Sequence, residues 1–237
     1  MNQKSPHLVL VPGLLCDHAL WEPQIAALSD ICVPWVVDLT RDDSMATMAA
    51  RVLAEAPAQR FALAGLSMGG YVAMEIMRLA PQRVTQLALL DTRATLDTSE
   101  ETARRHELMR LAQTERGFTP ITTRMLPLLV HPARVNDEPL VRVIRDMAER
   151  IGAEAYVRHQ QAIISRPDFR PDLQRIGCPT LVLCGREDAL TPLERHEEIV
   201  RQIPTARLVV IERCGHLSTL ERPHEVNVAL RDWLVGP

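Results

Sequence analysis

Short runs of β-branched and aliphatic residues alternate along the chain with longer stretches in which apolar positions recur at helical spacing. Such alternation is typical of a parallel sheet that is covered by helices on both faces. The pattern predicts strands at 7–12, 31–38, 60–66, 84–91, 179–184 and 206–211. It predicts helices between them at about 19–29, 44–56, 68–80, 192–203 and 223–235. We therefore expect an α/β fold with a mostly parallel sheet of about six strands.

The alternation stops between residue 95 and about residue 170, where no convincing strand is found. This stretch is rich in charged, helix-favouring residues and predicts helices at Ser99–Arg116, Ile121–Leu129, Val135–Ile151 and Ala153–Ser165. It contains twelve arginines and eleven acids, so each single charge there is expected to lie on a solvated outer face. We predict a core formed by residues 1–94 and 171–237, with a helical lid inserted at 95–170.

Composition narrows the class of protein. The length of 237 residues suits one domain with an insertion, and apolar and charged shares of 46% and 24% are those of an ordinary globular protein. The formal charge of −3, with no basic stripe, argues against a nucleic-acid partner. No apolar stretch reaches the length of a membrane span. Five widely spaced cysteines indicate reduced thiols and a cytoplasmic location, and Pro12 and Gly13 interrupt the only segment that resembles a signal sequence.

The segment Gly65–Gly70, which reads Gly-Leu-Ser-Met-Gly-Gly, lies between a predicted strand and a predicted helix. A nucleophilic serine on a tight strand-to-helix turn needs glycines two residues to either side, because Cβ atoms there would clash. The start of the helix also favours a developing negative charge. Ser67 is therefore the candidate nucleophile.

A serine needs an imidazole that takes its proton and an acid that orients the imidazole. His216 follows Gly215 in the loop after the last strand, at the edge where α/β sheets assemble their sites. Asp188 also follows a strand, and the order Ser, Asp, His is the one expected of this arrangement. Asp91 is the alternative candidate for the acid of the triad. If it does not have that role, we expect it to hydrogen-bond the first turn of the lid. The other histidines are expected on the surface or away from this edge: His7, His18, His106, His131, His159, His196 and His224.

An oxyanion would need two backbone donors. One is the N–H of Met68, the residue after the nucleophile. The other should come from the loop after the first strand, where Gly13 lets the chain turn so that the N–H of Leu14 faces the serine.

From about residue 7 to residue 235 the chain resembles the α/β-hydrolase superfamily. The resemblance is carried by Val11–Leu15 with Trp21 downstream, Gly65–Gly70, Gly185–Asp188 and Gly215–His216. Within the superfamily, these motifs are similar to those of bacterial 3-oxoadipate enol-lactonases and the small carboxylesterases near them. The resemblance implies hydrolysis through an acyl-enzyme, without cofactor or metal ion. Leu15, Trp21 and Leu217 lie in or beside these motifs and are expected to contact the substrate.

The leading interpretation is a hydrolase of a small-molecule carboxylic ester or lactone. The alternatives are a C–C bond hydrolase or lyase-like relative that uses the same triad, and a ligand-binding receptor on a hydrolase scaffold. Because aromatic residues are only 3% of the chain, we expect a pocket lined by Leu, Met and Ile. The sequence indicates neither the acyl and alcohol parts of the substrate nor the oligomeric state.

Overall fold

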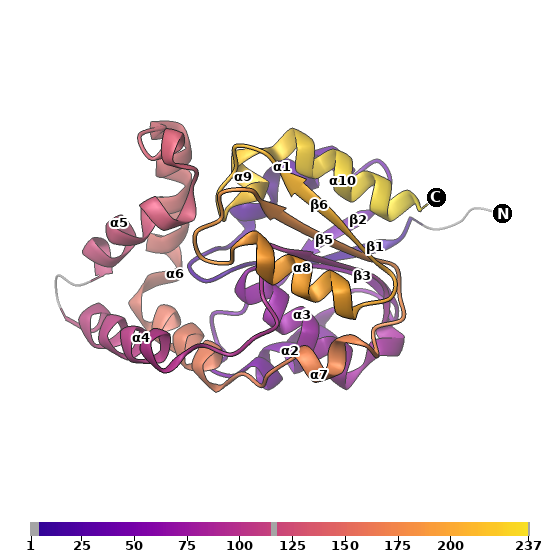
Figure 1. Ribbon diagram of the computed structural model, residues 1–237, viewed down its shortest axis with the longest axis horizontal. Coiled ribbons are helices and arrows are strands. Elements are labelled where there is room, and N and C mark those ends of the chain that lie inside the picture. Colours follow the sequence, from indigo (N-terminus) through magenta and orange to yellow (C-terminus); the bar gives the residue numbers. More distant parts are fainter. Residues whose placement is uncertain (1–4, 115–117, 237) are drawn as a thin grey trace.

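A computed structural model describes residues 5–114 and 118–236 and contains a six-stranded, entirely parallel sheet (Figure 1). The strand order is β2-β1-β3-β4-β5-β6. The strands are β1 His7–Val11, β2 Val33–Val36, β3 Phe61–Leu66, β4 Val84–Leu90, β5 Thr180–Gly185 and β6 Ala206–Ile211. The predicted fold class is confirmed, and each predicted strand is present within a few residues of its expected bounds.

Helices cover both faces of the sheet, as the alternation predicts (Figure 1). One face is covered by α1 Glu22–Leu28 and α10 Pro223–Val235. The other is covered by α2 Met45–Glu55, α3 Met68–Leu79 and α8 Leu193–Gln202. Three short elements complete the core, the 3-10 helices η1 His18–Trp21 and η2 Pro81–Arg83, and α9 Ser218–Glu221.

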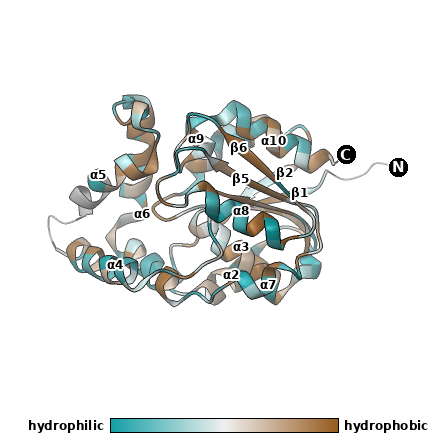
Figure 2. Cartoon of the chain, viewed as in Figure 1, coloured by the Kyte–Doolittle hydropathy of each residue, from teal (hydrophilic) through white to brown (hydrophobic). Residues whose placement is uncertain are grey.

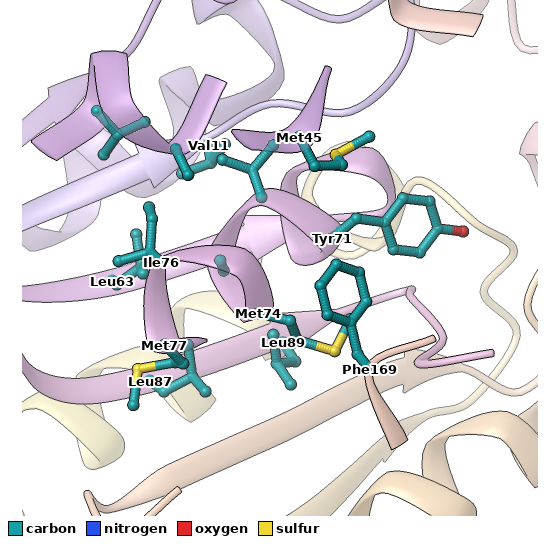
Figure 3. Packing of buried hydrophobic residues seen from close by; sticks show 14 of the residues in the cluster. Val11, Met45, Leu63, Tyr71, Met74, Ile76, Met77, Leu87, Leu89 and Phe169 are labelled. Carbon is teal, nitrogen blue, oxygen red and sulfur yellow. The ribbon is translucent and has the colours of Figure 1, made fainter. Parts of the chain in front are cut away.

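The central strands are mostly apolar because both of their faces are covered. Every residue of β3 is buried, and its alternate side chains enter the two different clusters of the core. Figure 3 shows the cluster on the α3 side, where the sheet residues Leu63, Leu87 and Leu89 lie near Met74, Ile76 and Met77 of α3. In Figure 2 strands such as β5 and β6 are largely coloured hydrophobic, whereas much of α4 is coloured hydrophilic.

Between β4 and β5 lies the helical insertion, residues 95–170, beyond the ends toward which the strand arrows point (Figure 1). Its elements are α4 Ser99–Ala112, α5 Phe118–Leu129, η3 Pro132–Arg134 and α6 Glu138–Ser165, and the short α7 Arg170–Leu173 follows. α6 consists of two helical parts that meet at a kink, as predicted on either side of Gly152, whose φ of 73° is not helical. The predicted helix end at Arg116 lies outside the described residues. No helix among the described residues is long and apolar enough to span a membrane.

Candidate active site

Ser67 lies where β3 ends and α3 begins. Its φ of 56° is in the left-handed region, which is strained for a residue with a side chain. The flanking glycines make this turn possible, because a Cβ on Gly65 would lie 2.2 Å from the carbonyl oxygen of Gly69. A Cβ on Gly69 would lie 2.1 Å from the carbonyl oxygen of Val11. The two glycines therefore bring β1, β3 and α3 close enough to expose the serine at the edge of the sheet.

The structure brings Ser67, His216 and Asp188 together in one hydrogen-bonded chain. The Nε2 atom of His216 lies 2.8 Å from Ser67 Oγ, and its Nδ1 atom lies 2.8 Å and 3.0 Å from the two carboxylate oxygens of Asp188. The Asp188 carboxylate also accepts hydrogen bonds from the backbone N–H groups of Leu190 and Thr191 and from the Thr191 hydroxyl. These donors hold the carboxylate so that it faces the imidazole.

Asp188 and His216 shift each other's pKa, so that Asp188 is favoured as a carboxylate and His216 becomes more basic. Burial opposes ionisation of Asp188, but the adjacent His216 and the hydrogen bonds from His216 and Thr191 outweigh it and lower the pKa of Asp188. Burial likewise disfavours a protonated His216, but the Asp188 carboxylate outweighs it and raises the pKa of His216. The imidazole is thus a stronger base than a free histidine.

Asp91, the rival acid, is also fully buried at this edge, but it has other partners. Its oxygens accept hydrogen bonds from the backbone N–H of Gly185 and from the hydroxyl and backbone N–H of Ser218. The expectation that Asp91 bonds the first turn of the lid is therefore wrong, because the ends of β5 and of the His216 loop lie closer to it. Burial, and secondly the charge of Asp188, raises the pKa of Asp91 to about 8. Asp91 therefore ties the end of β5 to the loop that carries His216.

The loop after β1 passes directly over the serine. A Cβ on Gly13 would lie 3.3 Å from Ser67 Cβ, so glycine allows this close approach. The next residue, Leu14, lines the same cavity as Ser67. Met68 is the first residue of α3, where helix geometry leaves the backbone N–H without an intrahelical acceptor. The structure thus places both predicted oxyanion donors in segments that adjoin the serine.

The Ser67 cavity has a volume of about 120 Å³ and contains Ser67, His216 and Leu217 in its wall. Of the three predicted substrate contacts, only Leu217 lines it. Trp21 is fully buried in the core on the α1 and α10 side, and Leu15 packs with residues of the helical insertion such as Ala112 and Tyr156. The prediction for these two residues relied on closeness in sequence, but the chain turns at Leu15, where φ is 62°.

Comparison with known proteins agrees with this geometry. A model of the alpha/beta hydrolase family matches residues 8–229. The chain belongs to the alpha/beta hydrolase family. It is 27% identical to the 3-oxoadipate enol-lactonase 2 of Acinetobacter baylyi, across 95% of this chain and 87% of the lactonase. It is 28% identical to the pimeloyl-[acyl-carrier protein] methyl ester esterase of Nitrosomonas europaea, across 93% of this chain and 92% of the esterase.

Solved structures show the same family resemblance. A thermophilic esterase from Thermogutta terrifontis, solved with malate bound, has a TM-score of 0.89 and 30% identity over 98% of this chain and 90% of that one. The enol-lactonase of Burkholderia xenovorans LB400, at 24% identity over 98% of this chain and 92% of that one, has a TM-score of 0.89 and shows the shared fold. Family and relatives together make this chain a hydrolase.

The hydrolase has charged residues in the cavity wall that the sequence analysis missed. Besides the expected aliphatic residues Met125, Leu129 and Ile163, the Ser67 cavity is lined by Arg93, Glu101 and Arg105. We had expected the charges of residues 95–170 to lie on a solvated face. Arg93 follows the end of β4 by three residues, so the rule that located Ser67, His216 and Asp188 at strand ends could have found it.

These side chains belong to a network in which three guanidinium groups meet two carboxylates. Asp97 pairs with Arg93, Arg105 and Arg166, and Glu101 pairs with Arg93. Burial opposes ionisation of Asp97, but Arg166 and Arg105 lower its pKa to about 2, so the acid is charged. The network therefore carries one excess positive charge in and beside the wall of the Ser67 cavity. Among the described residues, Nε of the buried Arg93 has no hydrogen-bond partner.

A buried carboxylate joins the His216 loop to the helical insertion. Glu221 accepts hydrogen bonds from the backbone N–H of Gly215 at 2.8 Å and of His131 at 2.7 Å, one with each oxygen. The Leu129 carbonyl in turn accepts from the backbone N–H groups of His216 and Leu217. The loop that carries His216 is thus held by hydrogen bonds to the helical insertion as well as by its attachment to the sheet.

Two histidines expected on the surface are buried instead. His196 accepts a hydrogen bond from the backbone N–H of Thr92, and burial lowers its pKa to about 4. His159 contacts the backbone carbonyl of Leu39. Neither lines the Ser67 cavity. Across residues 5–114 and 118–236 no cluster of three His, Cys, Asp or Glu side chains is arranged to hold a metal ion.

Proposed function

We propose that this hydrolase cleaves a carboxylic ester or a lactone, with Ser67 as nucleophile, His216 as general base and Asp188 as the orienting acid. The observation that carries the proposal is the continuous hydrogen-bonded chain from Ser67 Oγ through both ring nitrogens of His216 to Asp188. Two relatives, a lactonase and a methyl ester esterase, are named for breaking an acyl–oxygen bond, which supports the choice of bond.

In the first half of the reaction, Ser67 Oγ attacks the carbonyl carbon while His216 Nε2 takes the hydroxyl proton. The Asp188 carboxylate holds the proton on Nδ1 and stabilises the imidazolium that forms. The N–H groups of Leu14 and Met68 donate to the oxyanion of the tetrahedral intermediate. When the acyl–oxygen bond breaks, the imidazolium gives its proton to the leaving alkoxide, and the acyl group stays on Ser67.

In the second half, a water molecule takes the place of the alcohol. His216 removes a proton from the water, which attacks the acyl-enzyme and then releases the carboxylic acid as the proton returns to Ser67 Oγ. Met125 and Leu129 of the helical insertion line the cavity, which supports a role of residues 95–170 as a lid that limits the access of bulk water.

The excess positive charge in the cavity wall supports an ester or lactone whose acyl part carries a second, ionised carboxylate. A guanidinium cluster that is partly buried and has more cations than anions is costly unless a further anion joins it. Arg93 and Arg105 both line the Ser67 cavity and can supply that pairing. The malate bound to the related esterase from Thermogutta terrifontis is itself a dicarboxylate, which agrees with this class of ligand.

The direct test is to treat the protein at neutral pH with a fluorophosphonate, which phosphonylates an activated serine. We expect one label per chain, located at Ser67 by peptide mass spectrometry, and none in Ser67→Ala. Ser218→Ala is the matched control, because Ser218 lies in the same region but hydrogen-bonds Asp91. Label at Ser218, or label on Ser67→Ala, would contradict the assignment. Labelled protein that hydrolyses no ester or lactone would favour the receptor alternative.

A further inference from the structure

The last glycine of the motif around the nucleophile, Gly70, is not explained by the turn that exposes Ser67. Gly65 and Gly69 make that turn possible, whereas Gly70 faces a different segment of the chain. A Cβ on Gly70 would lie 2.5 Å from Oγ1 of Thr92 and 2.7 Å from its Cβ. Gly70 therefore makes room for Thr92, which follows the end of β4 by two residues.

Thr92 contacts the backbone of the nucleophile across this gap. Its hydroxyl donates a hydrogen bond of 2.8 Å to the carbonyl oxygen of Ser67. The backbone N–H of Ser67 in turn donates to the carbonyl oxygen of Leu90 at 2.9 Å. Both backbone polar groups of Ser67 are thus held by residues 90–92. A left-handed φ such as the 56° of Ser67 persists only where the surrounding structure fixes it.

Thr92 is itself held by a buried histidine of α8. The Nε2 atom of His196 accepts a hydrogen bond of 2.9 Å from the backbone N–H of Thr92. Burial lowers the pKa of His196 to about 4, so the ring is neutral and its one proton is on Nδ1. Nδ1 lies 3.4 Å from the carbonyl oxygen of Pro192, which follows the loop that carries Asp188. A series of hydrogen bonds therefore runs from the end of the Asp188 loop through His196 and Thr92 to Ser67.

This series of hydrogen bonds lies outside the Ser67 cavity. Thr92 and His196 are fully buried, and neither contributes to the cavity wall, so they act on the reaction only through the residues that they hold. The reaction itself depends on alignment, because Ser67 Oγ has to stay within hydrogen-bond distance of His216 while it attacks. A displacement of about 1 Å at such a site costs about a hundredfold in rate.

We propose that Thr92 and His196 are positioning residues, which hold the backbone of Ser67 in the conformation needed for attack and fix it relative to the Asp188 loop. The inference rests on the proposed role of Ser67 as nucleophile. Substitutions at the two positions should then lower kcat and leave KM nearly unchanged, because neither residue touches the substrate.

Thr92→Val tests the proposal with the smallest change, since valine has the shape of threonine but cannot donate to the Ser67 carbonyl. The substrate is monomethyl glutarate, an ester whose acyl part ends in a carboxylate. We expect kcat to fall by about ten- to a hundredfold and KM to change by less than about twofold. Thr92→Ser keeps the hydroxyl and should restore most of kcat. A kcat near that of the wild type in folded Thr92→Val would overturn the proposal.

Thr95→Val is the matched control. Thr95 is also buried in the segment after β4, but its hydroxyl has no hydrogen-bond partner among the described residues. The control removes a buried hydroxyl without breaking a hydrogen bond and should leave kcat unchanged, with melting temperatures measured for both variants. An equal loss of kcat in both would mean that the segment supports packing only, and would overturn the proposal.

The pH profile of Thr92→Val shows which member of the triad has moved. Its acidic limb depends on His216 and Asp188, so it should stay at the wild-type pH while kcat falls. A shifted limb would mean that the substitution disturbs the imidazole instead of the serine, and this result would overturn the proposed role of Thr92.

His196 is tested in combination with Thr92. His196→Leu leaves the N–H of Thr92 unsatisfied, whereas His196→Gln retains an acceptor and should lower kcat less. Because His196 acts through Thr92, a variant with both Thr92→Val and His196→Leu should be no more than about threefold slower than the slower single variant. Losses that multiply would show that the two residues act separately. If His196→Leu does not fold, His196→Gln serves in the same comparison.

The rate of labelling by a fluorophosphonate separates this inference from the proposed function. Labelling needs an aligned Ser67 but no turnover of an ester or lactone, so it should slow in Thr92→Val by about the same factor as kcat. Wild-type protein that hydrolyses no ester or lactone would contradict the proposed function, and the labelling rates would still test the positioning. Active wild-type protein whose labelling and turnover are unchanged in Thr92→Val would overturn the positioning alone.

Discussion

The sheet edge and the helical insertion both contribute walls to the Ser67 cavity, but their side chains are held in different ways. At the edge, backbone geometry within a few residues decides the position of each group, as with Ser67 between Gly65 and Gly69. In the insertion, Arg105 is held by Asp97, eight residues away, and by Gln160, 55 residues away on α6. The edge is therefore specified by local motifs, and the insertion by tertiary contacts.

This contrast predicts that the largest losses of activity come from the edge. Ser67→Ala should lower kcat for an ester by about a millionfold, the scale seen when a nucleophile that works as part of a triad is removed. The hydroxyl contributes little to packing, so the melting temperature should stay within a few degrees of wild type. Residual turnover near the wild-type rate in a folded variant would remove Ser67 from the reaction.

The second largest effect should separate the two buried acids of the edge. Asp188→Asn should lower kcat about ten-thousandfold, because the imidazole can then adopt the wrong tautomer. Asp91→Asn should cost far less, since Asp91 hydrogen-bonds Gly185 and Ser218, whereas His216 hydrogen-bonds Asp188. Both variants are to be assayed on one ester at one pH, with circular dichroism to check folding. The reverse order of effects would make Asp91 the orienting acid.

The dependence of kcat/KM on pH tests independently whether Asp188 acts on His216. Activity requires neutral His216, so kcat/KM should fall as the pH drops through the pKa of His216. Asp188 raises that pKa, and the acidic limb of the wild-type profile should therefore lie above the ordinary histidine value of about 6.5. In Asp188→Asn the limb should move to lower pH. An unmoved limb would mean that Asp188 does not act on His216.

The same contrast explains how much could be predicted from the sequence. Runs of apolar residues gave all six strands, and the positions of Ser67, His216 and Asp188 after strand ends brought them together. Arg105 and His159 could not be placed, because a helical pattern does not say which turn faces a cavity when the facing residues come from distant segments. The prediction for Trp21 was wrong because closeness in sequence to the oxyanion loop did not bring its side chain near Ser67.

A smaller loss of activity is expected at Glu221, which joins the His216 loop to the helical insertion. Glu221→Gln replaces one of two acceptor oxygens with a donor that faces the backbone N–H of Gly215 or His131. We expect kcat to fall by about ten- to a hundredfold and the free energy of unfolding by about 1–3 kcal/mol, the cost of an unsatisfied buried group. Kinetics and urea unfolding measure the two effects. Glu225→Gln, on exposed surface nearby, is the matched control and should change neither.

The smallest effect should come from the insertion and should depend on the substrate. Arg105→Gln removes one guanidinium group from the cavity wall and leaves Arg93 and Arg166 balanced by Asp97 and Glu101. For monomethyl glutarate, kcat/KM should fall about tenfold, the scale of one hydrogen bond to a charged group. For methyl butyrate, which lacks the second carboxylate, it should stay within about twofold. The ratio of the two values is the quantity to measure.

Arg110→Gln is the matched control, because Arg110 lies on the exposed side of the same helix α4 and does not line the cavity. It removes the same charge from the chain, so a general field effect would appear in both variants, while pairing inside the cavity would appear only in Arg105→Gln. Added salt sharpens the distinction, since it screens exposed charges more strongly than partly buried ones. If Arg105→Gln lowers kcat/KM equally for both esters, Arg105 supports the packing of the insertion and does not pair with substrate. The insertion would then resemble the sheet edge in shaping the cavity, and a carboxylate on the substrate would have to pair with Arg93 alone.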